Sequence, residues 1–288
     1  MFHGSMVALV TPFKKGKVDE KVLGSLVEFQ IKNGTKALVP CGTTGESPTL
    51  SHEEHKRVIE RVVDVASHRI PVIAGTGSNS TQEAIELTQY AKRVGVDAAL
   101  IVSPYYNRPT QAGLYEHFAA IAKAVNIPII LYNIPGRTGV NILPETMAKM
   151  STIKNIIGVK EATGNLDQMT HIASLCDMAI ISGDDSLTLP ILSIGGVGVI
   201  SVVANILPRK VQDMIEAWDR GQIALAKEIH LELYPLCKAL FIETNPVPIK
   251  AAMGMMGMIE EEVRLPLVKM GDDNRKILVK ELKKAKLI

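Results

Sequence analysis

The stretch "IIGVKEA" (residues 156–162) is a short apolar run that ends in a charged pair, Lys160 and Glu161. β-Branched, apolar runs of this length are typical of buried strands. Similar runs recur along the whole chain, and each is bounded by turn-forming or amphipathic sequence. They occupy residues 6–10, 37–42, 71–75, 98–103, 127–133, 178–182 and 196–202.

Amphipathic stretches lie between these runs, for example "SHEEHKRVIERVVDVAS" (51–67) and "STQEAIELTQYAKRVG" (80–95). Their apolar residues recur at helical spacing, and a Ser at each start is suited to cap a helix. Eight alternating strand and helix units predict an α/β fold with a parallel sheet, closed into a (β/α)8 TIM barrel. The competing architecture is a doubly wound open sheet. No Gly-x-Gly-x-x-Gly turn follows the first run, which weakens its dinucleotide-binding version.

The pattern changes at Pro208, after which the sequence is typical of helices alone. We therefore predict a catalytic barrel over residues 1–222 and a C-terminal α-helical domain over residues 223–288. Such an appended bundle would pack on the barrel or on another subunit.

The composition narrows the classes of partner. The 288-residue chain is 47% hydrophobic and 22% charged, as globular proteins are. Its net charge of +2 provides no overall field for nucleic acid or an anionic membrane, so neither is an expected partner. No apolar run reaches about 18 residues, so no membrane span is predicted. The N-terminus lacks the pattern of a signal peptide. Three widely spaced cysteines favour a reducing, cytoplasmic location.

Lys160 is the first candidate for catalysis, because active sites of such barrels lie at the carboxyl ends of the strands. A buried lysine needs a partner or must lose its charge. One interpretation is an ion pair with Glu161. The other is a neutral amine that forms a Schiff base with a ketone. Side chains alternate along a strand, so Glu161 should point away from Lys160, which disfavours the ion pair.

Other strand ends supply further candidates. The "GTTGES" segment (42–47) offers Thr43 and Thr44 to a small anion, although a Gly-rich turn with an ordinary polar cap would look similar. The run at 127–133 places Tyr132 at a strand end, with Arg137 in the loop beyond. A phenol hydrogen-bonded to Thr44 could exchange protons with an imine. A packed tyrosine and a solvated arginine are the structural alternatives.

"GTTGES", "YYNRPTQ", "YNIPGRTG", "GVKEA" and "SGDD", in this order, resemble the dihydrodipicolinate synthase family of pyruvate-dependent class I aldolases. The resemblance covers essentially the whole chain. It implies a lyase that condenses pyruvate with L-aspartate 4-semialdehyde in the first committed step of lysine and diaminopimelate synthesis. No cofactor is expected beyond the covalent imine of pyruvate on Lys160, and no metal site. A homotetramer, built as a dimer of dimers, is the expected assembly.

The resemblance also implies roles for individual residues. Lys160 would form the imine, and Tyr132, Thr44 and a Tyr106 from the neighbouring subunit would relay protons. The substrate-binding residues would be Thr43, Thr44, Arg137, Gly183 and Ile200. Thr43 and Thr44 would bind the pyruvate carboxylate, and Arg137 that of the semialdehyde.

A second group matches the site where some family members bind L-lysine as an allosteric feedback inhibitor. It comprises Ser47, Pro48, His52, His55, Asn79, Glu83 and Tyr105. Glu83 suits an ammonium group, and Tyr105 and Asn79 suit a carboxylate. Pro48 stands where many inhibited relatives have a small residue, but it keeps the backbone carbonyl that they use. The alternative is that "SHEEH" (51–55) is only a capped, solvated helix start.

Several other functions compete with this interpretation. N-acetylneuraminate lyase and 2-keto-3-deoxy sugar acid aldolases share the lysine and the tyrosine, whereas Arg137 favours a second substrate with its own carboxylate. A silent barrel that senses lysine would not need Lys160, Tyr132, Thr44 and Tyr106 together. A metal-dependent aldolase is disfavoured because no His, Asp and Glu cluster with ligand spacing follows the strands.

Overall fold

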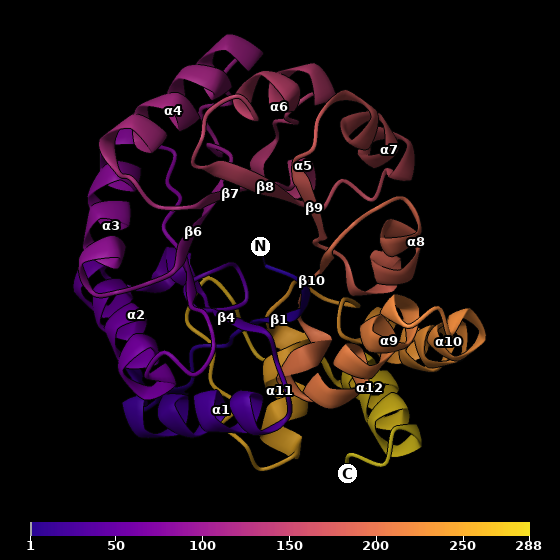
Figure 1. Ribbon diagram of the computed structural model, residues 1–288. Coiled ribbons are helices and arrows are strands. Elements are labelled where there is room, and N and C mark those ends of the chain that lie inside the picture. Colours follow the sequence, from indigo (N-terminus) through magenta and orange to yellow (C-terminus); the bar gives the residue numbers. More distant parts are fainter. Residues whose placement is uncertain (1) are drawn as a thin grey trace.

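Eight parallel strands form a closed barrel at the centre of the molecule (Figure 1). The computed structural model describes residues 2–288. Every one of the eight apolar runs overlaps a strand, so the predicted (β/α)8 barrel is confirmed. The barrel strands are β1 (Gly4–Ala8), β4 (Ala37–Val39), β5 (Ile73–Gly75), β6 (Ala98–Val102), β7 (Ile129–Asn133), β8 (Ile156–Glu161), β9 (Ala179–Ser182) and β10 (Gly198–Ser201).

The strands pair in the order β4-β1-β10-β9-β8-β7-β6-β5, and a bridge between Leu38 and Val72 joins β4 to β5. The Leu38 N–H donates to Pro71 O at 2.9 Å, and the Gly75 N–H donates to Pro40 O at 2.9 Å. These bonds close the barrel and bring the carboxyl ends of all eight strands to one rim. The strands are buried on both faces, which explains why their sequences are apolar throughout.

Helices surround the barrel as an outer ring (Figure 1). The α2 helix begins with a capping box, in which Ser51 Oγ accepts from the Glu54 N–H and Glu54 accepts from the Ser51 N–H. The ring helices are α1 (Glu20–Lys32), α2 (His52–Ala66), α3 (Thr81–Arg93), α4 (Gln111–Ala124), α6 (Pro144–Met150), α7 (Leu166–Leu175), α8 (Thr188–Ser193) and α9 (Pro208–Asp219).

Three further helices follow the ring: α10 (Ile223–Ala239), α11 (Val247–Met255) and α12 (Asp272–Lys284). They gather on one side of the barrel beside α9, in the orange and yellow part of the chain (Figure 1). Leu278 and Leu282 of α12 are fully buried in the shared apolar core. The α9 helix ends at Asp219 and α10 begins at Ile223, near the division expected at residue 223.

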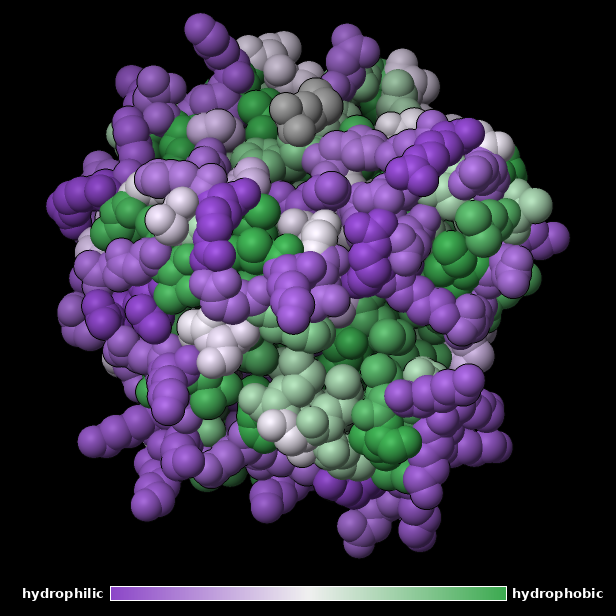
Figure 2. All heavy atoms as spheres, turned by 60° about the horizontal axis from the view of Figure 1, so that its bottom comes forward, coloured by the Kyte–Doolittle hydropathy of each residue, from purple (hydrophilic) through white to green (hydrophobic). Residues whose placement is uncertain are grey.

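Short elements complete the chain. They are the hairpin β2 (Phe13–Lys14) and β3 (Lys17–Val18), the helix α5 (Pro135–Thr138), and the 3-10 turns η1 (Ser47–Thr49), η2 (Asp185–Leu187) and η3 (Val203–Asn205). Hydrophilic side chains cover most of the face in Figure 2, and hydrophobic residues reach the surface in one larger area among them. None of the helices within residues 2–288 is long and apolar enough to cross a membrane.

Candidate active site

Lys160 and Tyr132 lie side by side at the carboxyl ends of β8 and β7. The parallel register pairs Tyr132 directly with Lys160. Lys160 Nζ lies 4.2 Å from the centroid of the Tyr132 ring. Each residue is only 6% exposed, so the amine and the ring meet inside the barrel rim and not on its surface.

A cavity of about 40 Å³ opens beside this pair. All five residues expected to bind substrate line this cavity. Its lining comprises Ala8, Val39, Gly42, Thr43, Thr44, Leu100, Tyr132, Ile134, Arg137, Lys160, Gly183, Asp184, Ile200, Val202, Phe241 and Asn245. The strand ends of the barrel therefore bring together Lys160, Tyr132 and Thr44, three of the four predicted catalytic residues.

The segment after β4, here called the 42–48 turn, forms one wall of the cavity. The Gly45 N–H donates to Gly42 O at 3.1 Å, and the Glu46 N–H donates to Thr43 O at 3.1 Å. A Cβ on Gly45 would lie 3.0 Å from Cys41 N, so the tight turn requires glycine there. Within residues 2–288, the N–H groups of Thr43 and Thr44 donate no hydrogen bond and remain available to an anion.

The hydroxyl of Thr44 has a partner that the sequence did not reveal. Asn245 Nδ2 donates to Thr44 Oγ1 at 3.0 Å. No hydrogen bond joins Thr44 to the Tyr132 hydroxyl in the described chain, so the expected relay is not a continuous hydrogen-bonded path here. Because the amide occupies an acceptor site of Oγ1, the Thr44 proton stays free to be donated.

The sequence predicted that Arg137 lies in a loop after the strand. In the structure Arg137 lies in the short helix α5. Its Nη2 donates to the main-chain oxygen of Asn245 at 3.0 Å. Arg137 lines the cavity, and guanidinium N–H groups are suited to a carboxylate.

Asn245, Phe241 and Asp184 line the cavity but were missed in the sequence. Phe241 and Asn245 come from the segment between α10 and α11, beyond the barrel. The Asn-Pro turn signal before α11 marked Asn245 only as a chain reversal. Burial raises the pKa of Asp184, and the nearby Lys160 and Lys238 partly oppose this shift.

Glu161 points away from Lys160 into the layer between barrel and helices, as strand alternation predicted. Its carboxylate accepts from Asn133 Nδ2 at 3.1 Å, from the Thr163 N–H at 3.0 Å and from Gln168 Nε2 at 3.4 Å. Burial raises the pKa of Glu161, and these donors oppose the shift. Lys160 therefore has no ion pair with its sequence neighbour to hold its amine.

Tyr106 does not line the cavity of its own chain. It follows β6 in a left-handed backbone conformation with φ of 70°, and 90% of its surface is exposed. Bulky residues rarely adopt this conformation, and such strain concentrates at functional sites. The geometry presents the Tyr106 ring outward, away from Lys160.

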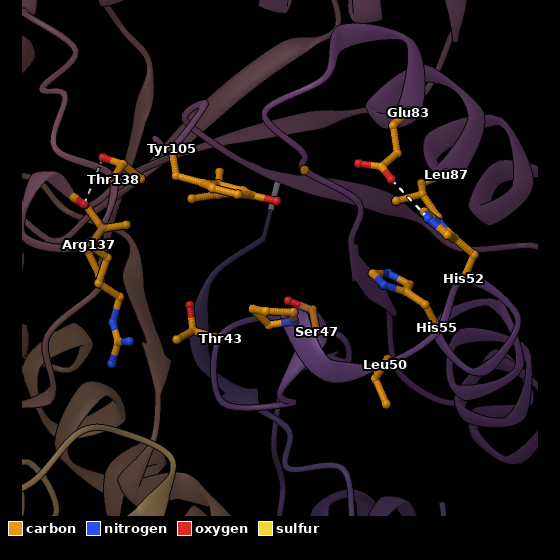
Figure 3. A pocket seen from close by; sticks show the side chains of 14 residues that line it. Thr43, Ser47, Leu50, His52, His55, Glu83, Leu87, Tyr105, Arg137 and Thr138 are labelled. Atoms are coloured by element: carbon orange, nitrogen blue, oxygen red, sulfur yellow. Dashed lines mark hydrogen bonds and ion pairs between the residues drawn. The ribbon is translucent and has the colours of Figure 1, made fainter. Parts of the chain in front are cut away.

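A second, larger cavity of about 430 Å³ shares Thr43, Ile134 and Arg137 with the first. Figure 3 shows Arg137 at one side of it, His52 and Glu83 at the other, and Thr43 and Tyr105 between them. Six of the seven residues expected to contact lysine line it: Ser47, Pro48, His52, His55, Glu83 and Tyr105. The seventh, Asn79, donates from Nδ2 to Tyr105 O at 3.2 Å.

The histidines of "SHEEH" differ in their surroundings. His52 Nε2 lies 3.1 Å from Glu83 Oε1 at the edge of the larger cavity. His55 Nε2 donates to Gly75 O at 2.7 Å, and burial lowers the pKa of this imidazole. The segment begins α2 with a capping box, and His55 is buried and not solvated. Within residues 2–288, no three His, Cys, Asp or Glu side chains group as metal ligands do.

Comparison with known proteins identifies the family. A profile described as the Dihydrodipicolinate synthetase family matches residues 1–285. The chain belongs to the dihydrodipicolinate synthetase family. A 4-hydroxy-tetrahydrodipicolinate synthase of Geotalea daltonii is 57% identical over the whole length of both chains. The resemblance noted in the sequence is confirmed, and with it the expected class of enzyme, a lyase of this family.

Solved structures of the dihydrodipicolinate synthetase family share this fold closely. The chloride-inhibited dihydrodipicolinate synthase of Acinetobacter baumannii, complexed with pyruvate, is 46% identical, with a TM-score of 0.98 and full coverage of both chains. An enzyme of Cyanidioschyzon merolae with lysine bound is 43% identical, with a TM-score of 0.97 over 100% of this chain and 99% of that one.

Glu161→Gln should destabilise this family member by about 1–3 kcal/mol, because the new amide would face three donors where a carboxylate accepted from them. The matched control is Glu228→Gln on α10, because this glutamate is exposed and its side chain makes no hydrogen bond or ion pair within residues 2–288. Thermal unfolding followed by circular dichroism would measure both. Equal midpoints for Glu161→Gln and the wild type would contradict the role given to this buried network.

Proposed function

We propose that this protein catalyses the 4-hydroxy-tetrahydrodipicolinate synthase reaction, the condensation of pyruvate with L-aspartate 4-semialdehyde, through an imine on Lys160. The observation that carries the proposal is the buried Lys160 amine, 4.2 Å from the Tyr132 ring centroid in a cavity lined by Thr44. Family membership and the 57% identity to a synthase of that name support it. The reaction belongs to lysine biosynthesis.

The chemistry follows from what a buried amine does to a ketone. Lys160 Nζ attacks the carbonyl carbon of pyruvate, and loss of water leaves an imine. The imine withdraws electrons, so a methyl proton of pyruvate is released and an enamine forms. The enamine carbon then attacks the aldehyde of the second substrate, which restores the imine. The amino group of that substrate attacks the imine carbon, closes a ring and releases the Lys160 amine. Tyr132, next to Nζ, is placed to carry protons in these steps. The imine supplies the electron sink, so the proposal requires no further cofactor.

Two groups would hold the substrates' carboxylates. Thr43 and Thr44 line the cavity, and their N–H groups donate no hydrogen bond within residues 2–288, so we propose that they bind the pyruvate carboxylate. Arg137 lies at the mouth, where the carboxylate of the semialdehyde would meet its guanidinium. Gly183 and Ile200 supply backbone to the remaining wall.

The proton relay would be completed by a second copy of the chain. Tyr106 is 90% exposed in a strained conformation, which supports its donation to a neighbouring subunit's site. This role requires a homo-oligomer, and we propose a dimer of dimers as its full form because the family resemblance implies it. The three cysteines, Cys41, Cys176 and Cys237, are unpaired, which is consistent with the proposed cytoplasmic location.

A substrate panel separates this function from that of the related aldolases. Pyruvate plus aspartate semialdehyde should be turned over at least about a hundredfold faster than N-acetylneuraminate or a 2-keto-3-deoxy sugar acid is cleaved, because Arg137 supplies the cation for the semialdehyde. A coupled assay on the purified enzyme would measure these rates. Arg137→Ala serves as the internal comparison. Faster cleavage of a sugar acid would favour the rival aldolases.

Borohydride should trap pyruvate on Lys160. The expected product is a reduced adduct at this one residue, located by mass spectrometry of peptides, with parallel loss of activity. Lys250 is also buried and is the natural comparison within the same digest. An adduct elsewhere, or an unmodified Lys160 after incubation with pyruvate, would refute the imine mechanism.

The larger cavity is proposed as a site for L-lysine. Glu83 provides a carboxylate for an ammonium group, and Tyr105, whose main-chain oxygen accepts from Asn79, supplies a polar group for the carboxylate. The lysine-bound relative from Cyanidioschyzon merolae supports this assignment. The two cavities share Thr43 and Arg137, so an occupant of the larger one would touch residues of the smaller one.

Glu83→Ala should weaken inhibition by lysine at least about tenfold, because a charge-assisted hydrogen bond of roughly 1.5 kcal/mol or more is lost. The concentration of lysine that halves activity is the measurement. Glu86 also lies on α3 but does not line the cavity. Glu86→Ala removes this carboxylate and should leave that concentration unchanged. If millimolar lysine does not inhibit the wild-type enzyme, the cavity has only a structural role.

A further inference from the structure

A fully buried ion pair lies behind the 42–48 turn. Lys250 Nζ on α11 contacts Glu46 Oε1 at 2.5 Å, and the two side chains are 0% and 1% exposed. Neither residue lines either cavity, so neither can touch a substrate. The pair joins residues that are separated by 204 positions and ties the C-terminal helices to the rim of the barrel.

Further contacts fix this pair in place. Glu46 Oε2 accepts from the Arg264 N–H at 3.1 Å. Lys250 Nζ lies 4.1 Å from the centroid of the Phe13 ring, and the Arg264 guanidinium lies 4.3 Å from the same centroid. Arg264 also donates to Thr49 O at 2.9 Å, at the end of η1. The C-terminal segment therefore contacts Glu46 and Thr49, which lie on either side of Ser47 and Pro48.

The backbone at Glu46 needs such support. Its φ of 52° and ψ of 37° lie in the left-handed region, which a residue with a Cβ adopts only at a cost. The Glu46 N–H donates to Thr43 O, and Glu46 O accepts from the Thr49 N–H at 3.0 Å. The direction of the Thr43 and Thr44 N–H groups thus depends on a strained residue two or three positions away.

Stability alone does not account for the pair. Burial lowers the pKa of Lys250, and the Glu46 carboxylate opposes this shift. Desolvation offsets much of the attraction in buried ion pairs, and well-packed apolar side chains often stabilise a fold equally well. What the charges add is a fixed direction and distance between the two elements.

We infer that Glu46 and Lys250 are positioning residues that hold the 42–48 turn in its carboxylate-binding shape. This inference rests on the proposed function, because the carboxylate is that of pyruvate. Thr43 and Ser47 of the same turn line the larger cavity, so the pair also sets the wall that the two sites share. The C-terminal helices thereby take part in substrate binding without touching the substrate.

The test uses Glu46→Gln combined with Lys250→Met, which leaves no unpaired charge in the core. The measurement is the pyruvate concentration that gives half-maximal borohydride trapping on Lys160, together with kcat and KM. We expect half-saturation to rise about tenfold, equivalent to one charge-assisted hydrogen bond, and trapping at saturating pyruvate to equal the wild type. The exposed pair Lys276→Met with Asp273→Asn is the control and should change nothing.

A double variant that folds, by circular dichroism, and binds pyruvate as the wild type does would overturn the inference. Glu46→Asp is the second variant: it keeps the charge but is one methylene shorter, so it should fold and still raise half-saturation. Wild-type half-saturation in Glu46→Asp would equally overturn the inference, even if the double variant failed to fold. Absence of trapping in the wild type would instead refute the imine mechanism, so the two failures are distinguishable.

Discussion

The register between β7 and β8 is the constraint on which the site depends. It pairs Tyr132 with Lys160, so that both side chains turn inward at the same height of the barrel. A slip of one residue would turn Lys160 outward and bring Glu161 into the interior. The Glu161 network with Asn133 and Gln168 on the outer face resists such a slip. The acceptor network on one side of the strand thus secures the amine on the other.

The sequence was sufficient for the barrel because each strand is apolar on both faces and each ring helix is amphipathic. It also pointed to Lys160, Tyr132 and Thr44, since parallel strands bring their carboxyl ends to one rim. Asn245 and Lys250 escaped because their partners, Thr44 and Glu46, lie about two hundred residues away in the sequence, and no local pattern encodes a contact of that range. Lys250 also lies in α11, a stretch whose sequence pattern predicts an ordinary helix and nothing more.

These long-range contacts change the meaning of the C-terminal helices. In the sequence they looked like an appended bundle beside a complete barrel. In the structure Asn245 holds both Thr44 and Arg137, while Lys250 and Arg264 hold Glu46. The cavity wall formed by the 42–48 turn is therefore built from the barrel rim and is held from outside it by residues that follow the barrel.

The closure of the barrel has a consequence for how the fold endures. β4 and β5 are only three residues long, and they meet through the bridge between Leu38 and Val72. Local opening under native conditions favours the segments with the fewest supporting bonds. Because the 42–48 turn leaves β4 at this seam, a ligand bound to the turn opposes its opening. We therefore expect a ligand bound to the turn to slow local opening at this junction of the sheet, and with it proteolysis.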